Sequence, residues 1–420
     1  MRLNSNLTNG LALVAVQGAN ALFPLLVFPF LLIVLGKNAF AELVVAEAMA
    51  FYVLTVCLYS FDTSGVQSIV EARQQGGKSA EAECFFNILG ARIALFIVSA
   101  VPMTIAYCIL ADGSLAVMLA WLCFVLGMIL QCNYYFQAVE SNALLAAFVL
   151  VSRVCAVLAI YLTINGAADL FIASLILAGS FLASGIAAFL FLLRYFGVKS
   201  MRSASVGGVL YLLREGRHLF FGNISVALFR GANVLILAGV SNSAAVSVYA
   251  VVEKIIKSIQ ALARPLNQLF IPKAIKAWSV LAVEHKTYLH AFEVIRKNTK
   301  IQICLMLIVL PLGGLALYIG RALGFLPGFS NETLILVLLM APAVIFGVAN
   351  AMFGAVGLTL IGAQSYFATA VFTVGVSTFL FSMVACYYFD AYGAAIAFVF
   401  AEMSLLIAFL WKYKRNEKNG

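Results

Sequence analysis

Long apolar segments, separated by short polar stretches, follow one another from near residue 10 to near residue 411. A helix needs about 20 apolar residues to cross the hydrocarbon core of a bilayer, and each segment is about that long. The segments lie near residues 10–35, 40–61, 86–111, 115–138, 143–165, 170–193, 218–240, 244–272, 301–320, 333–357, 367–389 and 393–411. The pattern predicts an all-α polytopic membrane protein with twelve transmembrane helices.

The polar stretches divide the chain into two halves. A polar segment at 62–84 follows the second apolar segment, and a basic one at 273–300 follows the eighth, so the two occupy matching positions. A 6+6 arrangement of this kind is typical of transporters whose site lies between two lobes. We predict two six-helix lobes, with the following division: an N-terminal lobe at 1–193, a cytoplasmic linker at 194–217, a C-terminal lobe at 218–411 and a basic tail at 412–420.

Composition and charge support a membrane protein and set its orientation. The chain is 64% hydrophobic and only 10% charged, whereas soluble domains are about one quarter charged. With both termini in the cytoplasm, Lys37 and Arg321 are the only basic residues predicted in loops on the opposite side. The positive-inside rule favours that orientation. The net charge of +9 is largely this topology signal and gives no reason to propose a nucleic-acid partner.

Catalytic and metal-binding motifs are absent from the sequence. The eight cysteines have no metal-ligand spacing, and the three histidines form no metal triad. Gly76-Gly77-Lys78-Ser79 resembles the end of a phosphate-binding loop, but Ala72 stands where that motif requires glycine. The first apolar segment is too long for the core of a signal peptide, so we expect it to be retained. We predict no catalytic residue and no metal site.

Charged residues inside the apolar segments are the exception that points to function. The eighth segment carries Glu253, Lys254, Lys257 and Arg264, although a charge at the bilayer centre costs about 2.5–3.5 kcal/mol even on lenient scales. At about 100° per residue, Glu253, Lys257 and Arg264 share one narrow helical face, and Lys254 lies at its flank. Such a face predicts a polar cavity.

Basic residues outnumber acidic ones in the central segments, because Arg153 and Arg230 also lie inside them. We predict an anion-binding cavity made by the basic side chains of Lys254, Lys257, Arg230, Arg153 and Arg264. Structural alternatives remain open. Glu253 and Lys257 are spaced to neutralise each other, Arg264 is placed to extend toward the interface, and Arg230 could pair with Glu402.

Several motifs resemble those of a known family. Asn133-Tyr-Tyr-Phe-Gln-Ala-Val-Glu140 is similar to the aromatic-Phe-Gln-Gly-x-Glu signature of Wzx-type O-antigen flippases, polysaccharide transporters of the MATE-like MOP superfamily. Tyr249-Ala-Val-Val-Glu-Lys-Ile-Ile-Lys257 resembles the eighth helix of that family, and Tyr392-Gly-Ala-Ala-Ile-Ala-Phe-Val-Phe-Ala-Glu402 resembles its last. The chain departs from the signature at Ala138, where the family usually has glycine.

The resemblance implies a flippase in the bacterial inner membrane. Its substrate would be an undecaprenyl-diphosphate-linked oligosaccharide repeat unit, moved from the cytoplasmic to the periplasmic leaflet by alternating access. An O-antigen polymerase and a chain-length regulator are the protein partners we expect. No cofactor is expected beyond a coupling gradient of H⁺ or Na⁺, and the candidate coupling acids are Glu253, Asp62, Glu402 and Glu140.

Two other functions are weighed against this one. A MATE-type exporter of small cationic drugs would share the fold, but it predicts an acidic cavity, against the basic excess in this chain. A membrane polymerase or ligase acting on the same glycan would need catalytic groups at the periplasmic face. Charged residues there are sparse, and no predicted loop on that side exceeds about a dozen residues.

Overall fold

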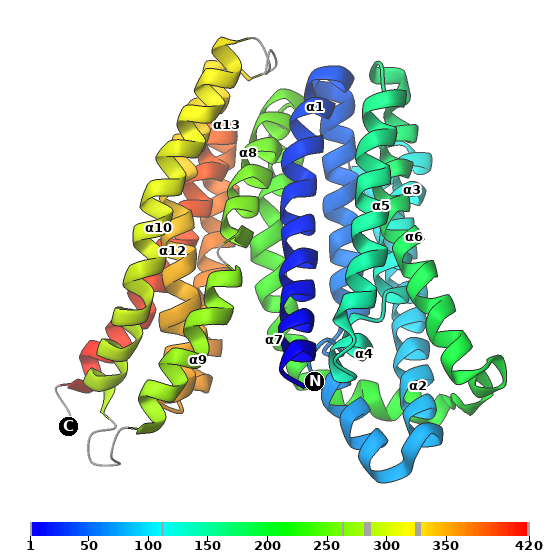
Figure 1. Cartoon of the computed structure of the whole chain (residues 1–420). Coiled ribbons are helices and arrows are strands. Elements are labelled where there is room, and N and C mark those ends of the chain that lie inside the picture. The colour runs from blue at the N-terminus through cyan, green and yellow to red at the C-terminus, as the bar shows by residue number, and fades with distance from the viewer. Residues whose placement is uncertain (1, 111–112, 263, 281–286, 324–328, 418–420) are drawn as a thin grey trace. The chain divides into compact units, whose positions relative to one another are not determined.

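The computed structural model describes residues 2–110, 113–262, 264–280, 287–323 and 329–417 (Figure 1). Within those ranges it does not describe the side chains of residues 2–17, 110, 218–219, 221–230, 262, 264–269, 272, 279 and 416–417. Every regular element of the described part is a helix. The all-α prediction is therefore confirmed.

Thirteen α-helices and three short elements make up the described chain. The first half contains α1 (Arg2–Leu58), α2 (Ser64–Leu110), α3 (Leu115–Leu130), α4 (Asn133–Ala138), α5 (Asn142–Thr163), η1 (Ala167–Asp169), α6 (Leu170–Phe196), η2 (Val198–Ser203) and α7 (Val206–Val240). The second contains α8 (Ser243–Leu262), α9 (Arg264–Val280), α10 (Tyr288–Ala322), α11 (Asn331–Met340), α12 (Pro342–Asn350), the π-helix η4 (Ala351–Leu358) and α13 (Gln364–Glu417).

The helices form two compact units. Unit 1 comprises residues 1–19 and 34–231, and unit 2 comprises residues 20–33 and 232–420. Helices α1 and α7 therefore each contribute residues to both units. The predicted lobe boundaries and linker stay a prediction.

Eight helical segments of the described chain are long and apolar enough to cross a membrane, which makes this a multi-pass membrane protein. Three of them contain a break, at Gly36 in α1, at Gly77 in α2 and at Asp390 in α13. The breaks at Gly36 and Asp390 fall where we predicted a boundary between two spans. Helix α8 is not among the eight, because Glu253, Lys254 and Lys257 make it more charged than an ordinary span. The count of twelve and the cytoplasmic termini stay predictions.

Close helix packing holds unit 1 together. A Cβ atom on Gly127 of α3 would lie 2.4 Å from the backbone nitrogen of Leu182 in α6, and one on Gly185 would lie 2.3 Å from the Gly127 oxygen. Small residues let helix backbones approach in this way. Beside this contact, the Gln131 amide donates to the buried Ser184 hydroxyl at 2.8 Å.

Candidate functional site

An ion pair lies on the charged face of α8. The Lys257 ammonium is 3.0 Å from Oε1 of Glu253, one helical turn away, as their spacing allows. The two ends differ in exposure, because the Glu253 side chain is 6% exposed and that of Lys257 is 41% exposed. The acid is enclosed by protein, while the amine remains accessible.

Buried hydrogen bonds connect this acid to two other helices of unit 2. Tyr249 donates its hydroxyl hydrogen to Glu253 at 3.3 Å, and Asn233 of α7 donates from its amide to the Tyr249 oxygen at 2.9 Å. The Asn233 amide oxygen accepts a bond from Ser382 of α13 at 2.8 Å. All four side chains are buried. A continuous polar network therefore joins α7, α8 and α13 within apolar segments.

Lys254 lies next to this network on the flank of α8. Its ammonium is 4.5 Å from the ring centroid of Phe28, which belongs to the part of α1 assigned to unit 2. A cation over an aromatic face gains about 0.5–2 kcal/mol, depending on how dry the contact is. The structure thus brings Lys254, Lys257 and Glu253 together on one helix, as the sequence pattern indicates.

A second acid of unit 2, Glu402, has an amide for a partner. Asn350 of α12 donates to its carboxylate at 2.7 Å and to its backbone oxygen at 2.8 Å. Glu402 is 8% exposed and forms no ion pair with another described residue. Arg230, which we considered as its cation, has a side chain outside the described residues, and so does Arg264.

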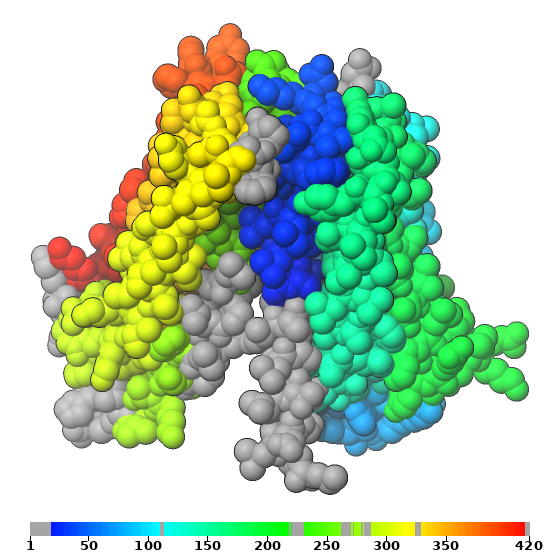
Figure 2. Space-filling view, turned by 45° about the horizontal axis from the view of Figure 1, so that its top comes forward, coloured from blue at the N-terminus to red at the C-terminus, as the bar shows by residue number. Residues whose placement is uncertain are grey.

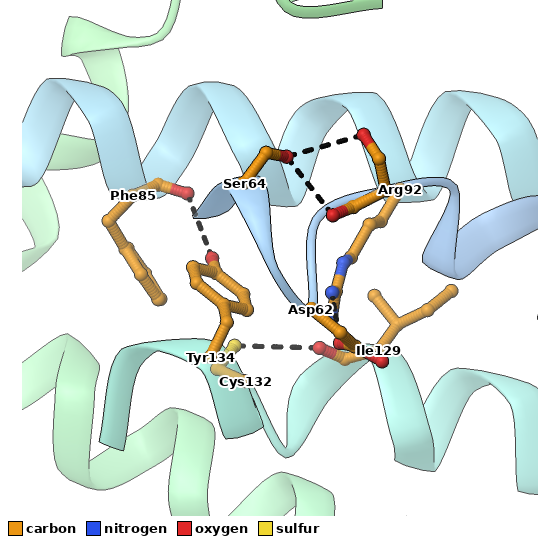
Figure 3. A network of polar contacts seen from close by, with 8 residues as sticks. Asp62, Ser64, Phe85, Arg92, Ile129, Cys132 and Tyr134 are labelled. Carbon is orange, nitrogen blue, oxygen red and sulfur yellow. Dashed lines mark hydrogen bonds and ion pairs between the residues drawn. The ribbon is translucent and has the colours of Figure 1, made fainter. Parts of the chain in front are cut away.

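Unit 1 holds an ion pair in which the cation, and not the acid, is the buried member. Arg92 of α2 is 1% exposed and donates from Nη2 to Asp62 at 2.8 Å, whereas the Asp62 side chain is 54% exposed (Figure 3). The guanidinium lies 4.7 Å from the ring centroid of Tyr134 and 5.9 Å from that of Phe61. Asp62, a candidate coupling acid, is therefore engaged in an ion pair.

The remaining candidates of unit 1 lie elsewhere. Arg153 of α5 is 4% exposed. Its guanidinium stacks 3.4 Å from the ring centroid of Phe181 in α6 and donates to the Ser180 hydroxyl. Glu140 is exposed at the turn between α4 and α5, with a φ of 54°. Among the described residues, no group of three or more His, Cys, Asp or Glu side chains could hold a metal ion.

Three buried polar residues of the site were not predicted from the sequence. Ser382 donates a hydrogen bond to Asn233, and Asn350 donates one to Glu402. An isolated Ser or Asn in an apolar segment has no pattern that would distinguish it. Glu81, 2% exposed, accepts a bond from Tyr135 at 2.8 Å. The aromatic motif around Tyr135 was a signal for that site, but its partner lies in a stretch that reads as a polar loop.

Family and sequence comparisons agree on one group of proteins. The model of a family described as "Polysaccharide biosynthesis protein" matches residues 7–277. The "Putative O-antigen transporter" of Escherichia coli (strain K12) is 23% identical over 418 residues, covering 98% of this chain and 97% of that protein.

Solved structures share the fold at low sequence identity. An inward-facing multidrug resistance MATE family transporter of the MOP superfamily superposes with a TM-score of 0.70 at 14% identity, over 97% of this chain and 98% of that one. The lipid II flippase MurJ, in an inward closed conformation, gives 0.66 at 12% identity, over 94% and 86%. The chain therefore shares the fold of these two solved structures.

Proposed function

The chain belongs to the polysaccharide biosynthesis protein family, and on that premise we propose that it is a flippase for lipid-linked oligosaccharides. Its substrate is an undecaprenyl-diphosphate-linked O-antigen repeat unit, moved from the cytoplasmic to the periplasmic leaflet of the bacterial inner membrane. The likeness to a relative named as an O-antigen transporter, and the fold shared with a lipid II flippase, support this choice. Twelve spans in two lobes, with both termini cytoplasmic, complete the proposal.

The observation that carries the proposal is the ion pair on α8, in which the acid is buried and the amine is accessible. Lys257 is accessible at 41% exposure, inside a helix whose other residues are largely apolar, while Glu253 behind it is buried. An ammonium held in a low-dielectric region binds phosphate oxygens through charge-assisted hydrogen bonds, which are the strong ones. Lys254, the residue after Glu253, adds a second cation to the same helix.

In the proposed cycle, the diphosphate binds Lys254 and Lys257, and the sugar hydroxyls bind nearby polar groups. Arg230 and Arg264 stay candidates for substrate binding, with side chains that lie outside the described residues. Arg153 supports α5 against α6, given its stacking on Phe181. The polyprenyl tail stays in the bilayer while the lobes alternate.

Coupling to an ion gradient is part of the same proposal. When a diphosphate binds Lys257, the ammonium leaves Glu253, and the buried carboxylate then requires a proton or Na⁺ in its place. Tyr249 and Asn233 keep the carboxylate oriented during this exchange. Glu402, Asp62 and Glu140 are secondary candidates, and of these Glu402 fits better, since it is buried without an ion pair to a described residue.

A flipping assay with purified protein tests the cationic site. We expect the K254A/K257A variant, reconstituted with lipid-linked repeat units, to flip at least about 100-fold more slowly, since each of the two charge-assisted bonds contributes about 1.5–3 kcal/mol. The variant K412A/K414A, which removes two lysines from the basic tail, serves as the matched control and should flip normally. Normal flipping by folded K254A/K257A, with surface glycan of normal length and amount, would refute the site.

The runner-up function is export of small cationic molecules. The fold shared with a multidrug transporter is compatible with this function. The buried acids Glu253 and Glu402 suit a cationic ligand. A deletion strain separates the two functions. Loss of surface glycan with unchanged drug tolerance supports the flippase, whereas drug sensitivity with normal glycan supports the exporter. A strain that still displays single repeats would point instead to a polymerase.

A further inference from the structure

A basic cavity lies on unit 2, away from the α8 network in sequence. Its volume is about 810 Å³, and it is lined by side chains of α10 and by Phe353 of the π-helix η4. The charged lining residues are Glu293, Arg296, Lys297 and Lys300. The proposed function uses none of them.

The cations of this cavity are concentrated on one side of the helix. Arg296, Lys297 and Lys300 lie within five residues and are exposed, and they face a single acid, Glu293. None of the three forms an ion pair with a described residue. The Arg296 guanidinium lies 5.9 Å from the ring centroid of Phe292, which leaves its donors available. The lining thus has a net charge that favours an anion.

An exposed apolar stripe begins where the cations end. Ile301, Leu305, Ile308 and Leu312 continue along α10 at helical spacing from Lys297, with exposed fractions between 38% and 59%. In the most apolar window of α10 only 6% of residues are buried, against 33–56% in the other long apolar segments of the described chain. In Figure 2, the yellow part of α10 is not covered by other helices on the face shown. In a membrane, lipid acyl chains cover an apolar face of this kind.

We propose that this cavity binds the phosphate head group of an anionic phospholipid, with the acyl chains lying along the apolar stripe of α10. Basic pockets at the cytoplasmic ends of membrane helices attract anionic lipids, each Lys or Arg contributing attraction near the surface. A free phosphate would gain nothing from the apolar stripe. Phospholipids form the bilayer itself, so mass action favours them over a scarce lipid-linked intermediate.

The position of the cavity gives the bound lipid a structural effect. Phe353 belongs to η4, and π-helical turns recur at functional sites because they depart from regular helix geometry. Phe292 of α10 packs on Phe353 with ring centroids 5.5 Å apart. A lipid seated between Lys300 and Phe353 braces α10 against η4, so bilayer composition regulates the stability of unit 2.

Cys304 gives the proposal a local readout, because it lines the cavity and is exposed. Cys155 on α5, also exposed, is the internal control. In detergent, we expect phosphatidylglycerol to slow maleimide labelling of Cys304 and not of Cys155, and phosphatidylcholine to slow neither. The R296Q/K297Q/K300Q variant should need about 100-fold more phosphatidylglycerol for the same protection.

A matched variant and two further ligands complete the test. R194Q/K199Q/R202Q removes three exposed basic residues from unit 1 and should retain wild-type protection. Equal protection of the cavity triple variant, or protection by inorganic phosphate alone, would overturn the lipid site. Stronger protection by a polyprenyl diphosphate than by phosphatidylglycerol would assign the cavity to the transported lipid and overturn the proposal as well. Since labelling requires no transport, this test is independent of the flippase proposal.

Discussion

Two ion pairs in this molecule are built in opposite ways. In unit 1 the cation is buried, since Arg92 is 1% exposed while its partner Asp62 is 54% exposed. In unit 2 the anion is buried, since Glu253 is 6% exposed while Lys257 is 41% exposed. The member that is enclosed determines what the pair can do.

Arg92 is held as part of the packing of unit 1. The ring of Tyr134 lies beside its guanidinium (Figure 3), and the ring of Phe61 is the second aromatic neighbour. Gly65 leaves so little space that a Cβ there would lie 3.1 Å from the Tyr134 ring. Glu253 is instead the end of a network that runs through Tyr249. The first pair fixes a structure, and the second presents an accessible cation while its acid stays connected to other helices.

Removing the acid from each pair gives the largest contrast. We expect Asp62→Asn to destabilise the protein by about 3–5 kcal/mol, because it leaves the buried Arg92 without its anion. Glu253→Gln should cost about 1 kcal/mol or less, because Lys257 remains accessible to polar surroundings. Thermal unfolding of the purified variants measures both, and a flipping assay should show Glu253→Gln inactive although stable.

If Asp62→Asn and Glu253→Gln unfolded at the same temperature, the proposed difference between the two ion pairs would be contradicted. Asp62→Glu is the matched control, since it keeps the charge and lengthens the side chain by one methylene. It should recover most of the stability that Asp62→Asn loses.

An intermediate effect is expected when the accessible cation of unit 2 is removed. Lys257→Gln leaves the Glu253 carboxylate buried, with the Tyr249 hydroxyl as its remaining partner among the described residues. We expect a loss of about 1–3 kcal/mol, the cost of a buried group that loses its partner. The double variant Glu253→Gln/Lys257→Gln should recover that stability without recovering transport. If the double variant were as unstable as Lys257→Gln, the buried acid would not be the cause.

The sequence supports the helical class and the local part of the site. Glu253 and Lys257 are one turn apart, so their pairing follows from helical geometry alone. Hydropathy likewise marks the boundaries that appear as breaks at Gly36 and Asp390. Both inferences rest on contacts between residues close together along the chain.

Contacts between distant segments could not be predicted in this way. Ser382 and Asn233 are separated by 149 residues, and their bond depends on how α7 and α13 pack. Arg92 is buried by the rings of Phe61 and Tyr134, which come from other segments of the chain. A single sequence indicates which face of each helix is polar, but not which other helix packs against that face.

The smallest expected difference between the two units comes from the tyrosine hydroxyls beside the two pairs. Tyr249→Phe removes the oxygen that lies between Asn233 and Glu253, so two buried groups lose a bond and stability should fall by about 1–2 kcal/mol. The Tyr134 hydroxyl is 3.5 Å from the Phe85 oxygen, at the limit of a hydrogen bond (Figure 3). Tyr134→Phe keeps the ring over Arg92 and should change stability by less than about 0.5 kcal/mol. Flipping should slow in Tyr249→Phe alone, because only that hydroxyl orients the acid we assign to coupling. A slower rate in Tyr134→Phe, at unchanged stability, would place coupling in unit 1 and reverse the roles of the two pairs.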